Sequence, residues 1–178
     1  MSEAPVRGAA TGGAPKGQAG VARGMGIALG VTVAIALLGY RRGDATMLEV
    51  RGRTLGIACL VLGLWVAAAV GDVARRRFGS GPAIDGADGV DPRVDAANAI
   101  LRNTAEQALL AALASGALTV LDDHARVAVG LFAACFSAGR LLFWSGYRDG
   151  AAARALGFGL TFYPSVAALL MAAVALLR

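Results

Sequence analysis

Four polar residues stand together at positions 102, 103, 106 and 107, at the head of an apolar run that extends to residue 121. On an α-helix, the i, i+3 and i+4 spacing places Asn103, Glu106 and Gln107 on one face. If the run spans a membrane, Glu106 lies at or just under the interface, where an ionisable group is costly and indicates a functional site. Such a face can hydrogen-bond a polar ligand and pair a carboxylate with a cation. Alternatively, Arg102 and Glu106 form a surface ion pair and Asn103 helps to cap the helix.

A second set of charged and aromatic residues follows in the last two apolar runs. Arg140 interrupts the first of these runs, and Trp144 and Tyr147 follow it at helical spacing. Aromatic residues alone are typical of a lipid-facing surface or an interfacial belt. An unpaired arginine in hydrocarbon, however, costs at least about 2.5 kcal/mol, so Arg140 needs an anion, either Glu106 or a bound ligand. Arg154 opens the final run, where it either binds an anion or extends its charge to the interface.

The composition indicates an integral membrane protein. Hydrophobic residues make up 57% of the 178 residues and charged residues 16%, whereas soluble domains have roughly 45–50% and about 25%. The mean hydropathy is +0.62. The 17 basic residues lie between apolar runs rather than in one patch, which argues against nucleic acid as a partner. Cys59 and Cys135 lie inside apolar runs and His124 has no second ligand at metal spacing, so we expect neither a disulfide nor a bound metal.

We expect an all-α protein with five membrane-spanning helices, because five runs are long and apolar enough to cross the hydrocarbon core. Residues 1–23 are rich in Gly, Ala and Pro and predict a disordered tail. The predicted spans are 24–40, 54–74, 92–121, 125–147 and 154–177. The first run could instead belong to a signal peptide, but its cleavage-like triplet lies inside the apolar stretch, which favours a retained helix.

Two local features refine these helices. Asp91, which precedes a proline, and Asp123 are candidate caps for the helices that follow them. Gly26 and Gly30 form a small-xxx-small pair that predicts close packing against a neighbouring helix. The pair could equally reflect only the high glycine content of the chain.

Five spans place the two chain ends on opposite sides of the membrane. Ten basic residues then flank the spans on the N-terminal side and six on the other. This bias predicts a cytoplasmic N-terminus in a multi-pass protein of the inner or cytoplasmic membrane. Polar residues from three different helices then meet at the cytoplasmic end, namely Arg102, Asn103, Glu106, Tyr147 and Arg154.

Three motifs resemble those of the MAPEG family, the membrane-associated proteins in eicosanoid and glutathione metabolism: NTAEQ at 103–107, GRLLFWSGY at 139–147 and RALGFG at 154–159. The resemblance covers roughly residues 54–178. It implies a four-helix transmembrane bundle that assembles as a homotrimer and binds glutathione between neighbouring subunits, near the cytoplasmic face. The helix at 24–40 is then an addition to that bundle, in a member of bacterial type.

The resemblance also implies roles for individual residues. Asn103 and Glu106 would contact glutathione, as would Arg140 and Tyr147, and Arg154 would stabilise the thiolate. Ala99 stands where many members carry an arginine that binds glutathione. Arg102 or Arg93 could substitute for that arginine, although Arg102 points about 100° round the helix from Asn103. Phe143 and Phe158 stand where some members have His and Tyr.

Two functions therefore remain open. The first is a membrane-bound glutathione-dependent transferase or peroxidase that acts on lipophilic electrophiles, with glutathione as co-substrate and its arginine-stabilised thiolate as nucleophile. The second is a non-catalytic membrane protein that retains the bundle and has a lipid-binding or assembly role. Ala99 favours the second, and Arg140, Tyr147 and Arg154 favour the first.

Overall fold

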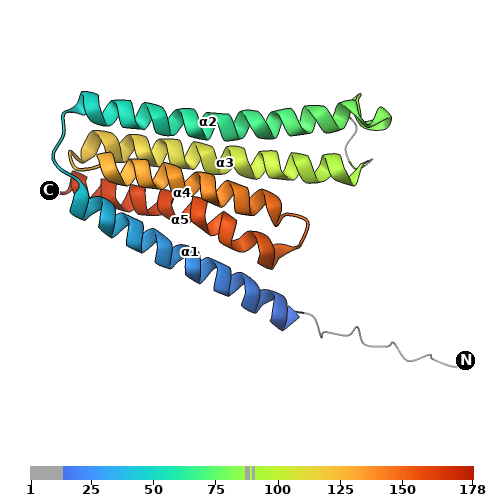
Figure 1. The fold of residues 1–178 in the computed structure, drawn as a ribbon, viewed down its shortest axis with the longest axis horizontal. Helices are drawn as coiled ribbons and strands as arrows, with labels where there is room; N and C mark the ends of the chain where they lie inside the picture. The colour runs from blue at the N-terminus through green and yellow to red at the C-terminus, as the bar shows by residue number, and fades with distance from the viewer. Residues whose placement is uncertain (1–13, 87–88, 90) are drawn as a thin grey trace, which may run out of the picture.

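Five long α-helices make up most of the described chain (Figure 1). The computed structural model describes residues 14–86, 89 and 91–178, and these residues contain no strand. A short 3-10 helix, η1 (Gly81–Ala83), follows the second helix. The five helices are α1 (Ala14–Arg42), α2 (Leu48–Phe78), α3 (Pro92–Leu121), α4 (Arg126–Ser145) and α5 (Ala151–Leu176).

Helices α2 to α5 run side by side, each antiparallel to the one before it, and α1 packs against α5 and α4. Helices α1, α3 and α5 therefore begin at one end of the bundle, on the right in Figure 1, where α2 and α4 finish. We call this end the N-terminal end of the bundle. The last residues of α5 lie at the opposite end, so the odd number of helices separates the start of α1 from the C-terminus.

All five helices are long and apolar enough to cross a membrane. The candidate span in α1 is Gly17–Arg42, and each of the other four helices contains an apolar window long enough to cross the hydrocarbon. Large hydrophobic side chains face outward along the helices, for example Leu60 on α2 and Leu109 on α3, as expected for a surface in contact with lipid. The prediction of an all-α, multi-pass integral membrane protein is confirmed.

Helices α1 and α2 extend further than the apolar runs that predict them, whereas α4 (Arg126–Ser145) is slightly shorter than its predicted span, 125–147. Helix α1 begins at Ala14 rather than at residue 24, so residues 14–23 belong to a helix and not to the predicted tail. Residues 1–13 of that tail lie outside the described part of the chain. Helix α2 begins at Leu48 rather than at residue 54 and continues to Phe78. A helix satisfies its own backbone hydrogen bonds, so it does not have to end where the hydrocarbon ends.

One of the two predicted caps is formed. The carboxylate of Asp91 accepts a hydrogen bond from the backbone N–H of Arg93 at 2.8 Å at the start of α3, and this bond holds the pKa of Asp91 below its usual value. Asp123 does not cap α4, because its carboxylate lies 2.6 Å from Nδ1 of His124. The residue at the capping position of α4 is Ala125, which makes no side-chain cap.

Glycine and alanine bring the helix backbones into direct contact. A Cβ atom at Gly139 of α4 would lie 2.8 Å from the carbonyl oxygen of Gly157 of α5, and one at Gly157 would meet the backbone of Phe143. Gly26 and Gly30, the pair predicted to pack, have open space where a Cβ would lie. The face of α1 that packs on the bundle carries Gly24 instead. A Cβ atom at Gly24 would lie 3.0 Å from the backbone nitrogen of Leu156.

This contact predicts that Gly157→Leu destabilises the bundle. The added side chain has no space between α4 and α5, and overpacking of this kind lowers the free energy of unfolding by about 1–3 kcal/mol. The measurement is thermal unfolding in one fixed detergent. Gly116→Leu on α3 is the matched control because a Cβ there meets nothing within 4 Å; equal unfolding temperatures for the two variants would contradict the prediction.

Candidate functional site

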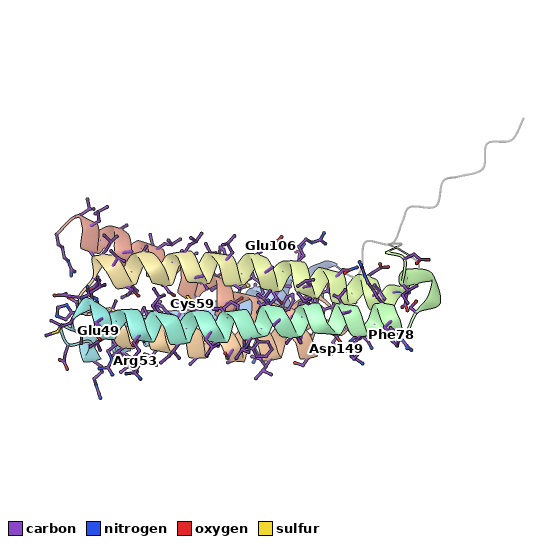
Figure 2. All side chains as sticks on the ribbon, turned by 90° about the horizontal axis from the view of Figure 1, so that it is seen from above. Glu49, Arg53, Cys59, Phe78, Glu106 and Asp149 are labelled. Carbon is purple, nitrogen blue, oxygen red and sulfur yellow. The ribbon has the colours of Figure 1, made fainter. Side chains whose placement is uncertain are left out.

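A cavity of about 490 Å³ opens at the N-terminal end of the bundle, between α1, α3, α4 and α5. Figure 2 shows Glu106 near the middle of α3, Asp149 in the turn after α4 further toward this end, and Glu49 and Arg53 toward the other. The volume lies within the range of about 300–1,000 Å³ that is usual for small-molecule sites. Side chains from four helices line it, so their chemistry decides what it can bind.

Helix α3 supplies the most polar wall. Ala99, Arg102, Asn103 and Glu106 all line the cavity, because positions i, i+3, i+4 and i+7 share one face of a helix. The predicted offset between Arg102 and Asn103 does not remove Arg102 from the site. The alternative ion pair is not formed, since no salt bridge joins Arg102 to Glu106 among the ion pairs of the described residues. Both charges therefore remain available to a ligand.

Arg140 lies behind this wall rather than in it. Its side chain is 0% exposed and does not line the cavity. Nη1 donates a hydrogen bond to Oδ1 of Asn103 at 2.9 Å, and Nη2 donates one to Oγ1 of Thr161 at 2.7 Å. The guanidinium also lies 4.7 Å from the ring centroid of Phe143 and 5.5 Å from that of Phe136. One buried cation thus joins α3, α4 and α5.

The predicted anion for Arg140 is therefore absent from the described residues. Glu106 is exposed on α3, and Arg140 instead bonds an amide, a hydroxyl and two aromatic faces, which stabilise a cation without an opposite charge. The pairing also orients Asn103. Because an arginine can only donate hydrogen bonds, Asn103 must turn Oδ1 toward Arg140, which leaves its Nδ2 group free to donate to a ligand.

Arg154 lines the cavity from the first turn of α5. Its guanidinium carbon is 4.8 Å from the ring centroid of Tyr147, and Tyr147 packs edge-on against Phe143 at 5.6 Å. A tight turn sets this arrangement, since Gly150 has φ 98°, which favours glycine. No carboxylate pairs with Arg154 within the part of the chain that the structure describes. The side chain therefore presents unpaired donors to the cavity.

The structure thus brings five of the six predicted site residues to one cavity, with Arg140 directly behind them: Arg102, Asn103, Glu106, Tyr147 and Arg154. Ala99, Phe143 and Phe158 line the same space.

Three contributors were not found from the sequence. Thr161 holds the second hydrogen bond of Arg140 and in turn donates to the carbonyl of Phe158 at 2.8 Å. Its only signal was a hydroxyl within the final apolar run. Val21 and Met25 of α1 line the cavity, and nothing in their residue types distinguishes them from lipid-facing positions.

A separate group of titratable side chains lies at the opposite end of the bundle. Asp122, Asp123 and His124 bring their ligand atoms within 4.8 Å of one another, so the lone histidine does have carboxylate neighbours. Nδ1 of His124 lies 2.6 Å from Asp123 and 3.7 Å from Asp122. Exposed acidic groups commonly gather in this way without a metal, and these residues are remote from the cavity.

Comparison with known proteins places the chain in a family. The model of the MAPEG family matches residues 54–174, which is more than half of the sequence and includes every predicted site residue. The matched region contains most of α2 and all of α3 and α4, together with nearly all of α5, and leaves α1 outside. Neither the curated proteins nor the solved structures gave a match. With its helical membrane bundle, this chain belongs to the MAPEG family.

Proposed function

We propose that this protein is a membrane-bound glutathione-dependent transferase or peroxidase that acts on lipophilic electrophiles. The MAPEG family includes such enzymes as well as non-catalytic members. The observation that carries the proposal is Arg154, whose guanidinium borders the cavity without a carboxylate partner and faces the same space as the polar wall of α3. A cation held in this way is suited to stabilise a thiolate.

The charged groups of the cavity match those of glutathione, which carries two carboxylates, an ammonium and a thiol. Arg102 offers a guanidinium fork for a carboxylate. Glu106 offers the opposite charge for the ammonium, and the Nδ2 group of Asn103 offers a further donor. Arg154 then stabilises the ionised thiol, and the ring of Tyr147 holds the Arg154 guanidinium in place.

The chemistry follows from the ionisation of the thiol. A free thiol has a pKa of about 8.5 and is mostly protonated at neutral pH, whereas a neighbouring guanidinium stabilises the thiolate, so the proton is released to solvent. In a transfer reaction, the sulfur bonds to an electrophilic carbon and the leaving group departs with its electron pair. With a hydroperoxide, the sulfur attacks the terminal oxygen and the O–O bond breaks to give an alcohol. The resulting sulfenic acid is reduced by a second glutathione, which yields the disulfide and water.

One observation favours the alternative, a non-catalytic membrane protein. Ala99 lines the cavity, so the arginine that many family members carry there is missing at the place where it would bind. Arg102 lines the same wall and supplies a guanidinium one turn along the helix. The enzyme proposal requires that this substitute arginine is sufficient for binding.

The proposed setting is a homotrimer in the inner or cytoplasmic membrane. The charge bias of the loops supports a cytoplasmic N-terminus. The cavity would then open at the cytoplasmic side, where a soluble peptide such as glutathione is available, while lipophilic substrates reach it from the bilayer.

Arg154→Ala tests the central role directly. We expect the pKa of bound glutathione's thiol to rise by about 1–3, because an adjacent opposite charge stabilises the ionised form by that amount. The ultraviolet absorbance of the thiolate, followed across a pH titration in detergent, reports the change. Arg148→Ala is the matched control, since it removes an exposed arginine at the same end of the bundle without touching the cavity. An unchanged thiol pKa in Arg154→Ala would exclude Arg154 from the mechanism.

Glu106→Gln tests the ammonium site. The variant keeps the shape of the side chain and removes its charge, so glutathione should bind about tenfold more weakly, which corresponds to about 1.4 kcal/mol for one charge-assisted contact. The pKa of the bound thiol should stay as in the wild type. Calorimetric titration measures the affinity of each protein for glutathione and for an analogue that lacks the amino group, and the thiolate absorbance measures the pKa of the bound thiol. If the variant loses no affinity for glutathione relative to the analogue, Glu106 does not hold the ammonium.

Arg140→Lys tests the positioning of Asn103. An ammonium cannot reproduce the fork that bonds Asn103 and Thr161 together, so the loss of one charged hydrogen bond should lower the free energy of unfolding by about 1.5–3 kcal/mol. Glutathione affinity should fall while the pKa of the bound thiol does not change. Arg148→Lys provides the control. A lower free energy of unfolding with full glutathione affinity would show that Arg140 is structural only.

A further inference from the structure

The cavity has an apolar side as well as a polar one. Val21 and Met25 of α1 face it together with Ala151, Ala155 and Phe158 of α5. The charged groups lie on α3 and at Arg154, which belongs to the same helix as Ala151, Ala155 and Phe158. A peptide and a lipophilic molecule could therefore occupy the two sides at once, with their reacting atoms meeting near Arg154.

Helix α1 is held tightly enough to act as a wall. A Cβ atom at Gly20 would lie 2.8 Å from Cβ of Ala152, and one at Gly159 of α5 would lie 2.6 Å from Cβ of Ala28. On α1, the small residues Gly20, Gly24 and Ala28 form a stripe at every fourth residue, which lets the backbones of α1 and α5 approach closely. Val21 and Met25 each follow a residue of this stripe, which turns both side chains toward the cavity.

Met25 packs beside Gly159 of α5. Its sulfur is 3.4 Å from the position that a Cβ of Gly159 would occupy. Methionine is unbranched and polarisable, so it adapts to apolar ligands of different shape. The pair Val21 and Met25 also belongs to residues 14–42, which lie outside the part of the chain that matches the family.

We propose that α1 forms the binding wall for the apolar part of the electrophile, and that Val21 and Met25 set the size and chain length that the site accepts. This proposal rests on the proposed glutathione-dependent function. The ligand class is an electrophile with an extended alkyl or aryl portion, whose reactive carbon or oxygen lies at the thiolate and whose apolar portion lies along α1.

S-alkyl glutathiones are suitable probes because the alkyl chain begins at the sulfur and does not react. Binding is measured for the methyl, propyl, butyl and hexyl derivatives in one detergent. Each methylene that becomes buried should strengthen binding about fourfold. The dependence of affinity on chain length therefore reports the apolar wall, and the affinity of the methyl derivative reports the polar site.

The decisive comparison is Gly24→Leu with Gly26→Leu. A Cβ at Gly24 would lie 3.0 Å from the backbone of α5, whereas one at Gly26, on the same helix, meets nothing within 4 Å. We expect Gly24→Leu to displace α1 and to reduce the gain per methylene to less than twofold, with unchanged affinity for the methyl derivative. Gly26→Leu should behave as the wild type. A full gain per methylene in Gly24→Leu would overturn the proposal.

A second pair of variants leaves the packing of α1 intact. Met25→Ala shortens a side chain that faces the cavity, and Ile27→Ala shortens one that is 48% exposed on the same helix. Only Met25→Ala should weaken the binding of the hexyl derivative, by about tenfold relative to the binding of the methyl derivative. Equal effects in the two variants would contradict a role for Met25. If none of the four derivatives binds the wild-type protein, the glutathione site itself is wrong, whereas normal binding without any effect of α1 rejects only this inference.

Discussion

The structure depends on one buried guanidinium at the depth of the cavity. Arg140 is fully enclosed, and its two hydrogen bonds reach Asn103 on α3 and Thr161 on α5 from its own helix α4. Hydrogen bonds to its donors and contacts with aromatic faces both stabilise a buried cation. The aromatic faces of Phe136 and Phe143 also lie against the guanidinium, and its buried Nε has no hydrogen-bond partner among the described residues. These contacts therefore hold α3, α4 and α5 together directly beside the cavity.

This arrangement assigns the charges of the site to different tasks. Arg140 has its donors directed at the protein and orients Asn103, while Arg102 and Arg154 keep their donors for a ligand. Glu106 supplies the opposite charge one turn from Asn103. The glycine contacts between α4 and α5, and between α1 and α5, bring the remaining walls close enough to enclose an apolar space beside these charges. The cavity thus combines the polar side chains of α3 and Arg154 with apolar side chains of α1 and α5.

The sequence predicts the class and the number of helices because apolar runs as long as the hydrocarbon thickness are rare outside membrane spans. It also predicts the residues that gather at one end, since Asn103, Tyr147 and Arg154 occupy the corresponding ends of successive spans. It does not predict the starts of α1 and α2, because a helix continues past the apolar run. One of the two hydrogen-bond partners of Arg140, Thr161, was missed because a threonine looks like an ordinary helix residue. The packing face of α1 was missed because Gly24 and Gly26 are the same residue type, and only the neighbouring helix distinguishes them.

The most direct test of a thiolate site is the number of protons released when glutathione binds. Calorimetric titrations at neutral pH, in buffers with different ionisation enthalpies, yield this number for the wild-type protein. We expect release of about one proton per glutathione, because a thiol that is protonated in solution becomes a thiolate beside Arg154. A peptide with alanine in place of the cysteine of glutathione should bind without that release. Equal proton release for the two peptides, or no binding of glutathione at millimolar concentration, would contradict a thiolate site at Arg154.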